Sequence, residues 1–334
     1  MAEEKPLVSA VINNHNYGRF IAQAIDSVLG QTYPADRVEL VVVDDGSTDD
    51  SRGVIESFGG RVKRVYQDHG GQAAALNAGI KAATGDIVCL LDSDDWWHPG
   101  KLARVVEWFS GNPSLGLVQH WCQEVDSNGR PLPGRPPRVT PVFRLQDFLA
   151  RRTYFTGTTG LSFRRDILAD VGPIPLGLTF CADEYFYTHA VFFAPVGTIQ
   201  EALAWRRVHG ANLYAGLYRS PERLADHLRV RAILDEAMDK RLRGKGLSFS
   251  EGEARRRRGE ILQEELFLAR YRGDRGRAWE RWRELGRLWG GAYGLFKQAA
   301  LLLAMISPAL YLGCFGFYAR WQGLVSVRQR LIKE

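Results

Sequence analysis

The sequence contains little cysteine, and its cysteines form no recognisable site. Cys89, Cys122, Cys181 and Cys314 are the four cysteines among 334 residues, and none stands in a CxxC pair. This argues against a structural zinc site and a disulfide scaffold, and it is typical of a reducing, cytosolic setting. The N-terminal MAEEKPLVSA has neither the basic nor the apolar segment of a secretory signal peptide.

Two nucleotide-binding motifs are also missing. Neither GxGxxG nor GxxxxGKS/T occurs, so the dinucleotide-binding and P-loop classes lose their main support. His15, His69 and His120 show no metal-ligand spacing, and we predict structural roles for them.

The bulk composition is that of an ordinary globular protein, with 45% hydrophobic and 25% charged residues. The length allows one large domain with an appendage, or two domains. A net charge of +6 permits anionic partners such as a membrane surface or a phosphorylated ligand. The arginine-rich segments carry no recognition motif for nucleic acid, so we expect no nucleic-acid partner.

Apolar runs alternate with amphipathic segments over the first part of the chain. We predict strands at residues 7–12, 38–43, 62–66 and 87–91, with helices between them. The second and fourth runs are almost continuously apolar, as buried parallel strands are. The alternation predicts an α/β fold, a doubly wound and mainly parallel sheet. In such sheets ligands bind outside the carboxyl ends of the strands.

Acidic residues follow two of these predicted strands. Gathered at one sheet edge, five carboxylates would repel one another and any diphosphate unless a divalent cation were bound. Mg²⁺ and Mn²⁺ prefer carboxylate and phosphate oxygens. The sequence therefore predicts a divalent cation, Mn or Mg, and a phosphate-bearing ligand; the structural alternative is a pair of solvated helix caps. The acids are Asp44, Asp45, Asp92, Asp94 and Asp95.

Three sequence blocks resemble the inverting family 2 glycosyltransferases of GT-A, Rossmann-like fold. They are VSAVINNHNYGRFIAQAIDSVLGQTYP, VELVVVDDGSTDDS and HGGQAAALNAGIKAATGDIVCLLDSDDWWHPGKL. The blocks GTTGLSFRRDILADVGPI and CADEYFYTHAVFFAPVGTIQEALAWRRVHGAN extend the resemblance over about 210 residues, the size of a catalytic domain. The resemblance implies transfer of a sugar from a nucleotide-sugar donor, with a UDP-sugar favoured, to an acceptor hydroxyl in polysaccharide or glycolipid synthesis. The acceptor would be a glycan or lipid-linked.

The resemblance also implies roles for individual residues. Asp45 matches the acid that hydrogen-bonds the donor base, and Asp44 and Asn13 lie near the same pocket. His209 matches a position near the diphosphate or metal. The remaining residues match a DxD-type element that binds donor and metal: Asp92 and Asp94 for the donor, Asp94 and Asp95 for the metal.

The catalytic base is where the sequence departs from the family pattern. Asp183 matches the general base of the family's Glu-Asp pair. Ala182 stands where the glutamate is usual, and Glu184 follows as the alternative base. The departure gives weight to a degenerate member that serves as a binding or scaffold subunit. A nucleotidyltransferase is the other alternative, but it would need a glycine-rich basic loop where this chain has NNHNYGRF.

The domain organisation follows from these patterns. We expect a catalytic domain over 1–215, with a nucleotide-sugar half at about 1–110 and an acceptor half at about 111–215. A charged helical region at 216–290 and an apolar, basic segment at 291–334 would follow it.

No charged residue lies between Lys297 and Arg320, and this run is long enough to cross a bilayer. Pro308 weakens a straight span, so a helix lying in the membrane interface fits as well, and an apolar helix packed on the protein is the structural alternative. We therefore expect a cytoplasmic protein at the cytoplasmic face of a membrane.

Overall fold

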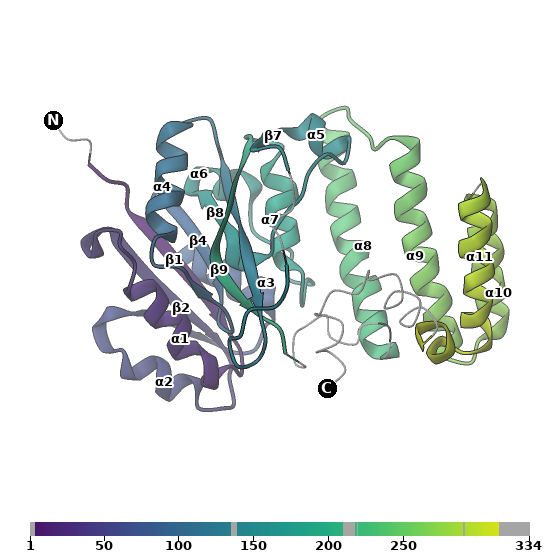
Figure 1. Ribbon diagram of the computed structural model, residues 1–334, viewed down its shortest axis with the longest axis horizontal. Coiled ribbons are helices and arrows are strands. Elements are labelled where there is room, and N and C mark those ends of the chain that lie inside the picture. The colour runs from purple at the N-terminus through teal and green to yellow at the C-terminus, as the bar shows by residue number, and fades with distance from the viewer. Residues whose placement is uncertain (1–3, 135–138, 210–217, 219, 290, 314–334) are drawn as a thin grey trace. The chain divides into compact units, whose positions relative to one another are not determined.

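A computed structural model describes residues 4–134, 139–209, 218, 220–289 and 291–313 (Figure 1). The chain divides into two compact units, Met1–Val208 and His209–Glu334. Each unit has its own hydrophobic core.

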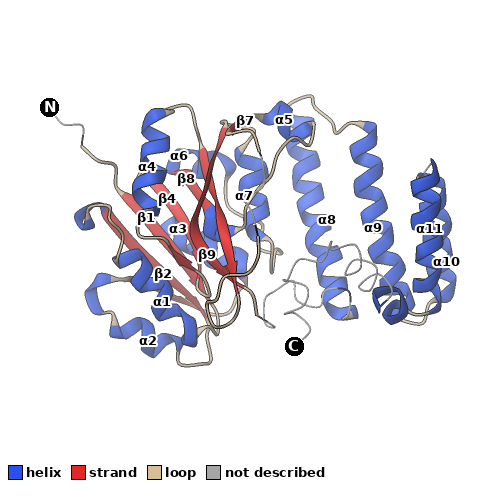
Figure 2. Ribbon diagram, viewed as in Figure 1, coloured by secondary structure: helices blue, strands red, loops and turns tan. Residues whose placement is uncertain are grey.

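The first unit is built on a nine-stranded sheet with helices packed around it (Figure 2). The sheet order is β3-β2-β1-β4-β8-β6-β9-β5, and β7 pairs with β9. Strands β3, β2, β1 and β4 are mutually parallel, whereas β8 runs antiparallel to both β4 and β6. The predicted α/β fold is confirmed as a mixed sheet. The strands are β1 Val8–Asn14, β2 Val38–Asp45, β3 Lys63–Gln67, β4 Ile87–Asp92, β5 Trp96–Trp97, β6 Leu117–Val125, β7 Val142–Phe143, β8 Leu161–Arg164 and β9 Val196–Arg207.

The helices of this unit use apolar stripes to cover the sheet. In α1, Ile21, Ile25 and Val28 are almost fully buried and join the core formed by β1 and β2. Their i, i+4, i+7 spacing is the reason the segment folds as a helix against an apolar surface. The helices are α1 Gly18–Leu29, α2 Ser51–Ser57, α3 Gln72–Ala82, α4 Lys101–Gly111, α5 Leu145–Leu149, α6 Arg165–Val171 and α7 Ala182–Ala190.

The second unit consists of helices among its described residues: α8 Pro221–Gly244, α9 Glu251–Tyr271, α10 Arg275–Leu288 and α11 Gly291–Ile306. Ser220, Ser250 and Asp274 cap the first three by accepting a hydrogen bond from a backbone N–H of the first turn. A small core centred on Phe267 and Leu301 holds the helices together. This helical region agrees with the arginine- and glutamate-rich periodicity of the sequence.

The uncharged run does not form one long helix where the structure describes it. Helix α11 ends at Ile306, just before Pro308, because proline cannot continue a regular hydrogen-bond ladder. Among the described residues no helix is long and apolar enough to cross a membrane. Residues 314–319 of the run lie outside the described part of the chain. Leu302, Ile306 and Leu310 are nevertheless exposed, with Ile306 at 69%.

Candidate active site

The sequence-predicted acids gather at the carboxyl edge of the parallel strands. In the sheet register Asn13 of β1 lies opposite Asp92 of β4, and Asn14 lies opposite Asp44 of β2. The strands end together because their apolar runs are paired in register and buried on both faces. The polar residues that follow each run therefore meet at one edge, as the sequence predicts.

The acidic turn, residues 92–95, links β4 to β5 at this edge. The side chains of Asn13 and Thr158 lie beside the Asp92 carboxyl group and favour its ionised form. Asp95 is buried, and its two carboxylate oxygens accept hydrogen bonds from the Thr159 hydroxyl at 2.5 Å and the Arg207 backbone N–H at 2.7 Å. Its carboxylate is thereby fixed in one orientation.

Negative charge is concentrated in this turn. Burial, together with the neighbouring charges of Asp94 and Asp183, raises the pKa of Asp92 to about 8. Burial and then Asp94 raise the pKa of Asp95 well above its ordinary value. Burial also raises the pKa of the Tyr17 phenol, which faces Asp94 and Asp92. Carboxylates that oppose one another's ionisation are relieved by a cation, and this all-oxygen donor set fits Mg²⁺ or Mn²⁺.

Asp183 lies in the first turn of α7 and reaches the same acids. The hydroxyl and backbone N–H of Thr158 lie beside its carboxyl group, the hydroxyl also lies beside Asp92, and both contacts favour the ionised carboxylates. Gly157 lies alongside, because a Cβ added there would stand 3.8 Å from Asp183 Oδ2. Burial raises the pKa of Asp183 above its ordinary value. Thr158 is therefore the bridge between Asp183 and the acidic turn.

Asp45 ends β2 in a separate, tightly bonded cradle. Oδ1 accepts hydrogen bonds from Gln67 Nε2 at 2.6 Å and Gly70 N at 2.8 Å, and Oδ2 accepts one from Gly71 N at 2.8 Å. Gly71 has φ +83° and so presents its N–H from a left-handed backbone that suits glycine. Gly46 has φ +67°, and a Cβ there would stand 2.6 Å from His69 N. The cradle thus depends on backbone as well as side chains.

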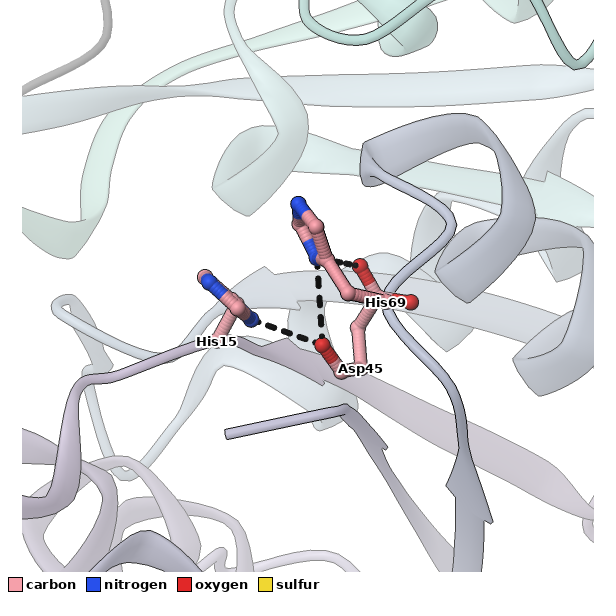
Figure 3. A group of neighbouring side chains, drawn as sticks. All are labelled: His15, Asp45 and His69. Carbon is pink, nitrogen blue, oxygen red and sulfur yellow. Dashed lines mark hydrogen bonds and ion pairs between the residues drawn. The ribbon is translucent and has the colours of Figure 1, made fainter. Parts of the chain in front are cut away.

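Two histidines complete this cradle (Figure 3). His69 Nδ1 is 2.8 Å from Asp45 Oδ2, and His15 Nδ1 is 2.7 Å from the Asp45 backbone oxygen. The two imidazole rings stack with centroids 4.0 Å apart. Sequence spacing gave no indication of this grouping, because the two histidines are 54 residues apart in the chain and follow different strands.

The other predicted residues take different positions. Asp44 is buried, and its carboxylate accepts hydrogen bonds from Asn14 Nδ2 at 2.8 Å and the Ser47 hydroxyl at 2.5 Å. It holds the turn after β2. His209 is the first residue of the second unit and is buried there.

Sequence reasoning also missed four residues that contact or face the acids: Tyr17, Thr158, Thr159 and Arg207. All four lie within the blocks that carry the family resemblance: Tyr17 in the first, Thr158 and Thr159 in GTTGLSFRRDILADVGPI, and Arg207 in the block that ends in AWRRVHGAN. Their positions in those blocks are the only sequence signal that would have found them.

Comparison with known proteins identifies the fold and family of this site. Residues 9–172 match the family model described as glycosyl transferase family 2. Residues 9–172 belong to this family. Among the chain's relatives is an uncharacterized glycosyltransferase of Nostoc sp. strain PCC 7120, 39% identical over 217 residues that cover 61% of this chain and 66% of the relative. The chain spans less than two thirds of the length of the first curated relatives it matches, and only 31% of the length of one from Rickettsia prowazekii.

Solved structures show that this family 2 chain has the GT-A fold. S. aureus TarS 1-349 in complex with UDP-GlcNAc has a TM-score of 0.58 at 18% identity, covering 83% of this chain and 90% of TarS. The mannosyltransferase PcManGT of Pyrobaculum calidifontis, in complex with GDP-Man and Mn²⁺, has a TM-score of 0.55 at 20% identity. That match covers 98% of this chain and 86% of PcManGT.

Proposed function

We propose that this protein is an inverting glycosyltransferase that moves a sugar from a nucleoside-diphosphate sugar to an acceptor hydroxyl, with a divalent cation as cofactor. The observation that carries the proposal is that Asp183 and Asp92 meet beside Thr158, close enough for the charge of Asp183 to raise the pKa of Asp92. A base and a cation-binding element are then adjacent at the ligand edge of the sheet. A scaffold subunit would have no need of this arrangement.

Asp94 and Asp95 are the proposed metal ligands. The hydrogen bonds that the two Asp95 oxygens accept from Thr159 and Arg207 fix the orientation of its carboxylate. When bound, Mn²⁺ or Mg²⁺ supplies positive charge that stabilises the departing nucleoside diphosphate. Arg207 contributes a fixed cation at the same turn, where its Nε donates to the Asp94 backbone oxygen at 3.1 Å.

Asp183 is the proposed general base. The acceptor oxygen forms its bond to the anomeric carbon, the bond to the diphosphate oxygen breaks, and the acceptor proton passes to the Asp183 carboxylate. Attack opposite the leaving group inverts the anomeric centre, through a transition state like the oxocarbenium ion of glycoside hydrolysis. Thr158 lies beside the Asp183 carboxyl group and helps to keep it in place, and Glu184 in the same helical turn is the alternative base.

The donor base is proposed to bind at Asp45, with the Asn13 and Asp92 side chains toward the sugar and His209 toward the diphosphate. TarS is bound to UDP-GlcNAc and PcManGT to GDP-Man, which supports a nucleotide sugar as the donor class. We favour a UDP-sugar.

The acceptor is proposed to be a glycan or a lipid-linked glycan at the cytoplasmic face of a membrane. Leu302 and Ile306 are exposed one turn apart on α11, and Leu310 is exposed on the helical segment 308–313 that follows. The sequence beyond is basic, with Arg320, Arg328, Arg330 and Lys333. Apolar side chains beside cations suit an anionic bilayer interface.

A ligand screen tests the proposed chemistry. Thermal unfolding of the full chain is measured with UDP and GDP, each with and without Mn²⁺, and we expect metal-dependent stabilisation by one of them, UDP foremost. Product analysis with the matching nucleotide sugar then shows transfer and the configuration of the new linkage. Product from a sugar 1-phosphate and a nucleoside triphosphate would instead identify a nucleotidyltransferase. Failure of every nucleotide to bind would overturn the proposal.

A further inference from the structure

Two nitrogen atoms and two oxygen atoms that can ligate a metal ion converge in the cradle around Asp45. Three adjacent parallel strands bring them together, since His15 follows β1, Asp45 ends β2 and His69 follows β3. His69 Nδ1 lies 2.8 Å from Asp45 Oδ2 and 3.2 Å from the Asp45 backbone oxygen, to which His15 Nδ1 also points at 2.7 Å (Figure 3). One ligand atom from each residue lies within 4.8 Å of the others.

We infer that His15, Asp45 and His69 form a binding site for a divalent transition ion such as Zn²⁺, separate from the acidic turn. Imidazole nitrogens with one carboxylate oxygen suit Zn²⁺, Cu²⁺ or Ni²⁺, whereas Mg²⁺ and Mn²⁺ prefer oxygen ligands. Without an ion, the Nδ1 proton of each histidine forms a hydrogen bond with Asp45. An ion takes the place of those protons and releases them to solvent.

The surroundings of Asp45 are those of a pre-oriented ligand. Gln67 Nε2 and Gly70 N hold Oδ1, so the carboxylate keeps Oδ2 directed at His69. Asn16 Nδ2 lies 3.0 Å from His15 Nε2 and orients that ring. Outer hydrogen bonds of this kind fix ligand orientation and raise metal affinity. The His69 side chain is 58% exposed, which gives an ion access from solvent.

The ion and the donor nucleotide would then compete for one carboxylate. This consequence rests on the proposed function, in which Asp45 hydrogen-bonds the donor base. Gln67 and Gly70 already donate to Oδ1 and Gly71 N donates to Oδ2, so a Zn²⁺ ion on Oδ2 would take the remaining acceptor position from the base. Zn²⁺ is therefore expected to weaken nucleotide binding even when Mn²⁺ saturates the acidic turn.

Calorimetric titration of the full, chelator-stripped chain with ZnCl₂ alone tests the site itself. We expect one equivalent to bind to the wild type, and His15→Asn and His69→Asn each to weaken that binding by at least about tenfold. His98→Asn is the matched control, since His98 is exposed and lies outside the cluster. No binding by the wild type, or binding that survives both cluster variants and is lost in Asp94→Ala, would overturn the inference.

Nucleotide titration in excess Mn²⁺ tests the competition. Added Zn²⁺ is expected to raise the apparent Kd of the nucleoside diphosphate in the wild type and to leave it unchanged in His69→Asn. The two proposals fail separately. Nucleotide binding without any Zn²⁺ site would refute the ion site alone, and a Zn²⁺ site in a chain that binds no nucleotide would refute the proposed function alone.

Discussion

Replacing Asp183 by asparagine should separate the chemical step from donor binding. The amide has nearly the shape of the carboxylate and keeps an oxygen beside Thr158, but it cannot take up the acceptor proton. A positioned general base contributes ~10²–10⁴-fold to the rate. That factor corresponds to about 3–5 kcal/mol of activation free energy. We expect kcat to fall by this factor while the Kd of the nucleotide stays near its wild-type value.

The assay pairs steady-state transfer with nucleotide titration in Mn²⁺. Glu184→Gln is the matched control, because it changes the neighbouring residue of the same helical turn in the same chemical way. Wild-type turnover in Asp183→Asn together with a loss in Glu184→Gln would refute the reasoning and move the base to Glu184. A lowered melting temperature with weakened nucleotide binding in Asp183→Asn would show a structural role instead.

Three further changes probe the metal site, the buried core and the membrane surface. Asp94→Ala should abolish Mn²⁺-dependent nucleotide binding, whereas the control Asp68→Ala, at an exposed site, should leave it intact. If nucleotide binding by Asp94→Ala still depends on Mn²⁺, Asp94 is not a metal ligand. Burial lowers the pKa of His120 from 6.5 to about 3, so below pH 6.5 only the unfolded chain takes up the proton and stability is lost. The free energy of unfolding is expected to fall by ~2 kcal/mol between pH 6.5 and about pH 5 in the wild type, and by less in His120→Gln, as measured by urea titration. An equal fall in both proteins would contradict this. Ile306→Glu should lower the affinity for anionic liposomes about tenfold or more in a sedimentation assay, whereas the control Leu176→Glu, at an exposed leucine, should not. Failure of the full-length protein to bind such liposomes would refute membrane contact.

Much of the architecture was predictable because it depends on local pattern. The apolar runs of β1, β2 and β4 are buried on both faces, and the polar residues after them had to fall at the carboxyl edge. The local pattern alone therefore places Asp45 and the acidic turn at the ligand edge. The helices α8–α10 were likewise predictable as a charged helical region from their arginine- and glutamate-rich segments.

The apolar segment near the C-terminus shows where a composition argument stops. Residues 298–319 carry no charge, and length alone allowed a span, an interfacial helix or a packed one. The structure ends α11 at Ile306 and buries Leu301 and Ala304 in the core of the second unit while leaving Ile306 exposed. Which face of a helix finds a protein partner depends on neighbours far along the chain.

Only the tertiary structure decided which groups stand beside the acids. Thr158 reaches Asp92 and Asp183 because β8, which follows it, inserts antiparallel between β4 and β6. Nothing local in the sequence encodes that insertion. His15 and His69 meet at Asp45 because β1, β2 and β3 are neighbours in the sheet. Spacing along the chain specifies the ends of strands, but the order of strands in the sheet determines which ends meet, and that order is set by packing of the whole unit.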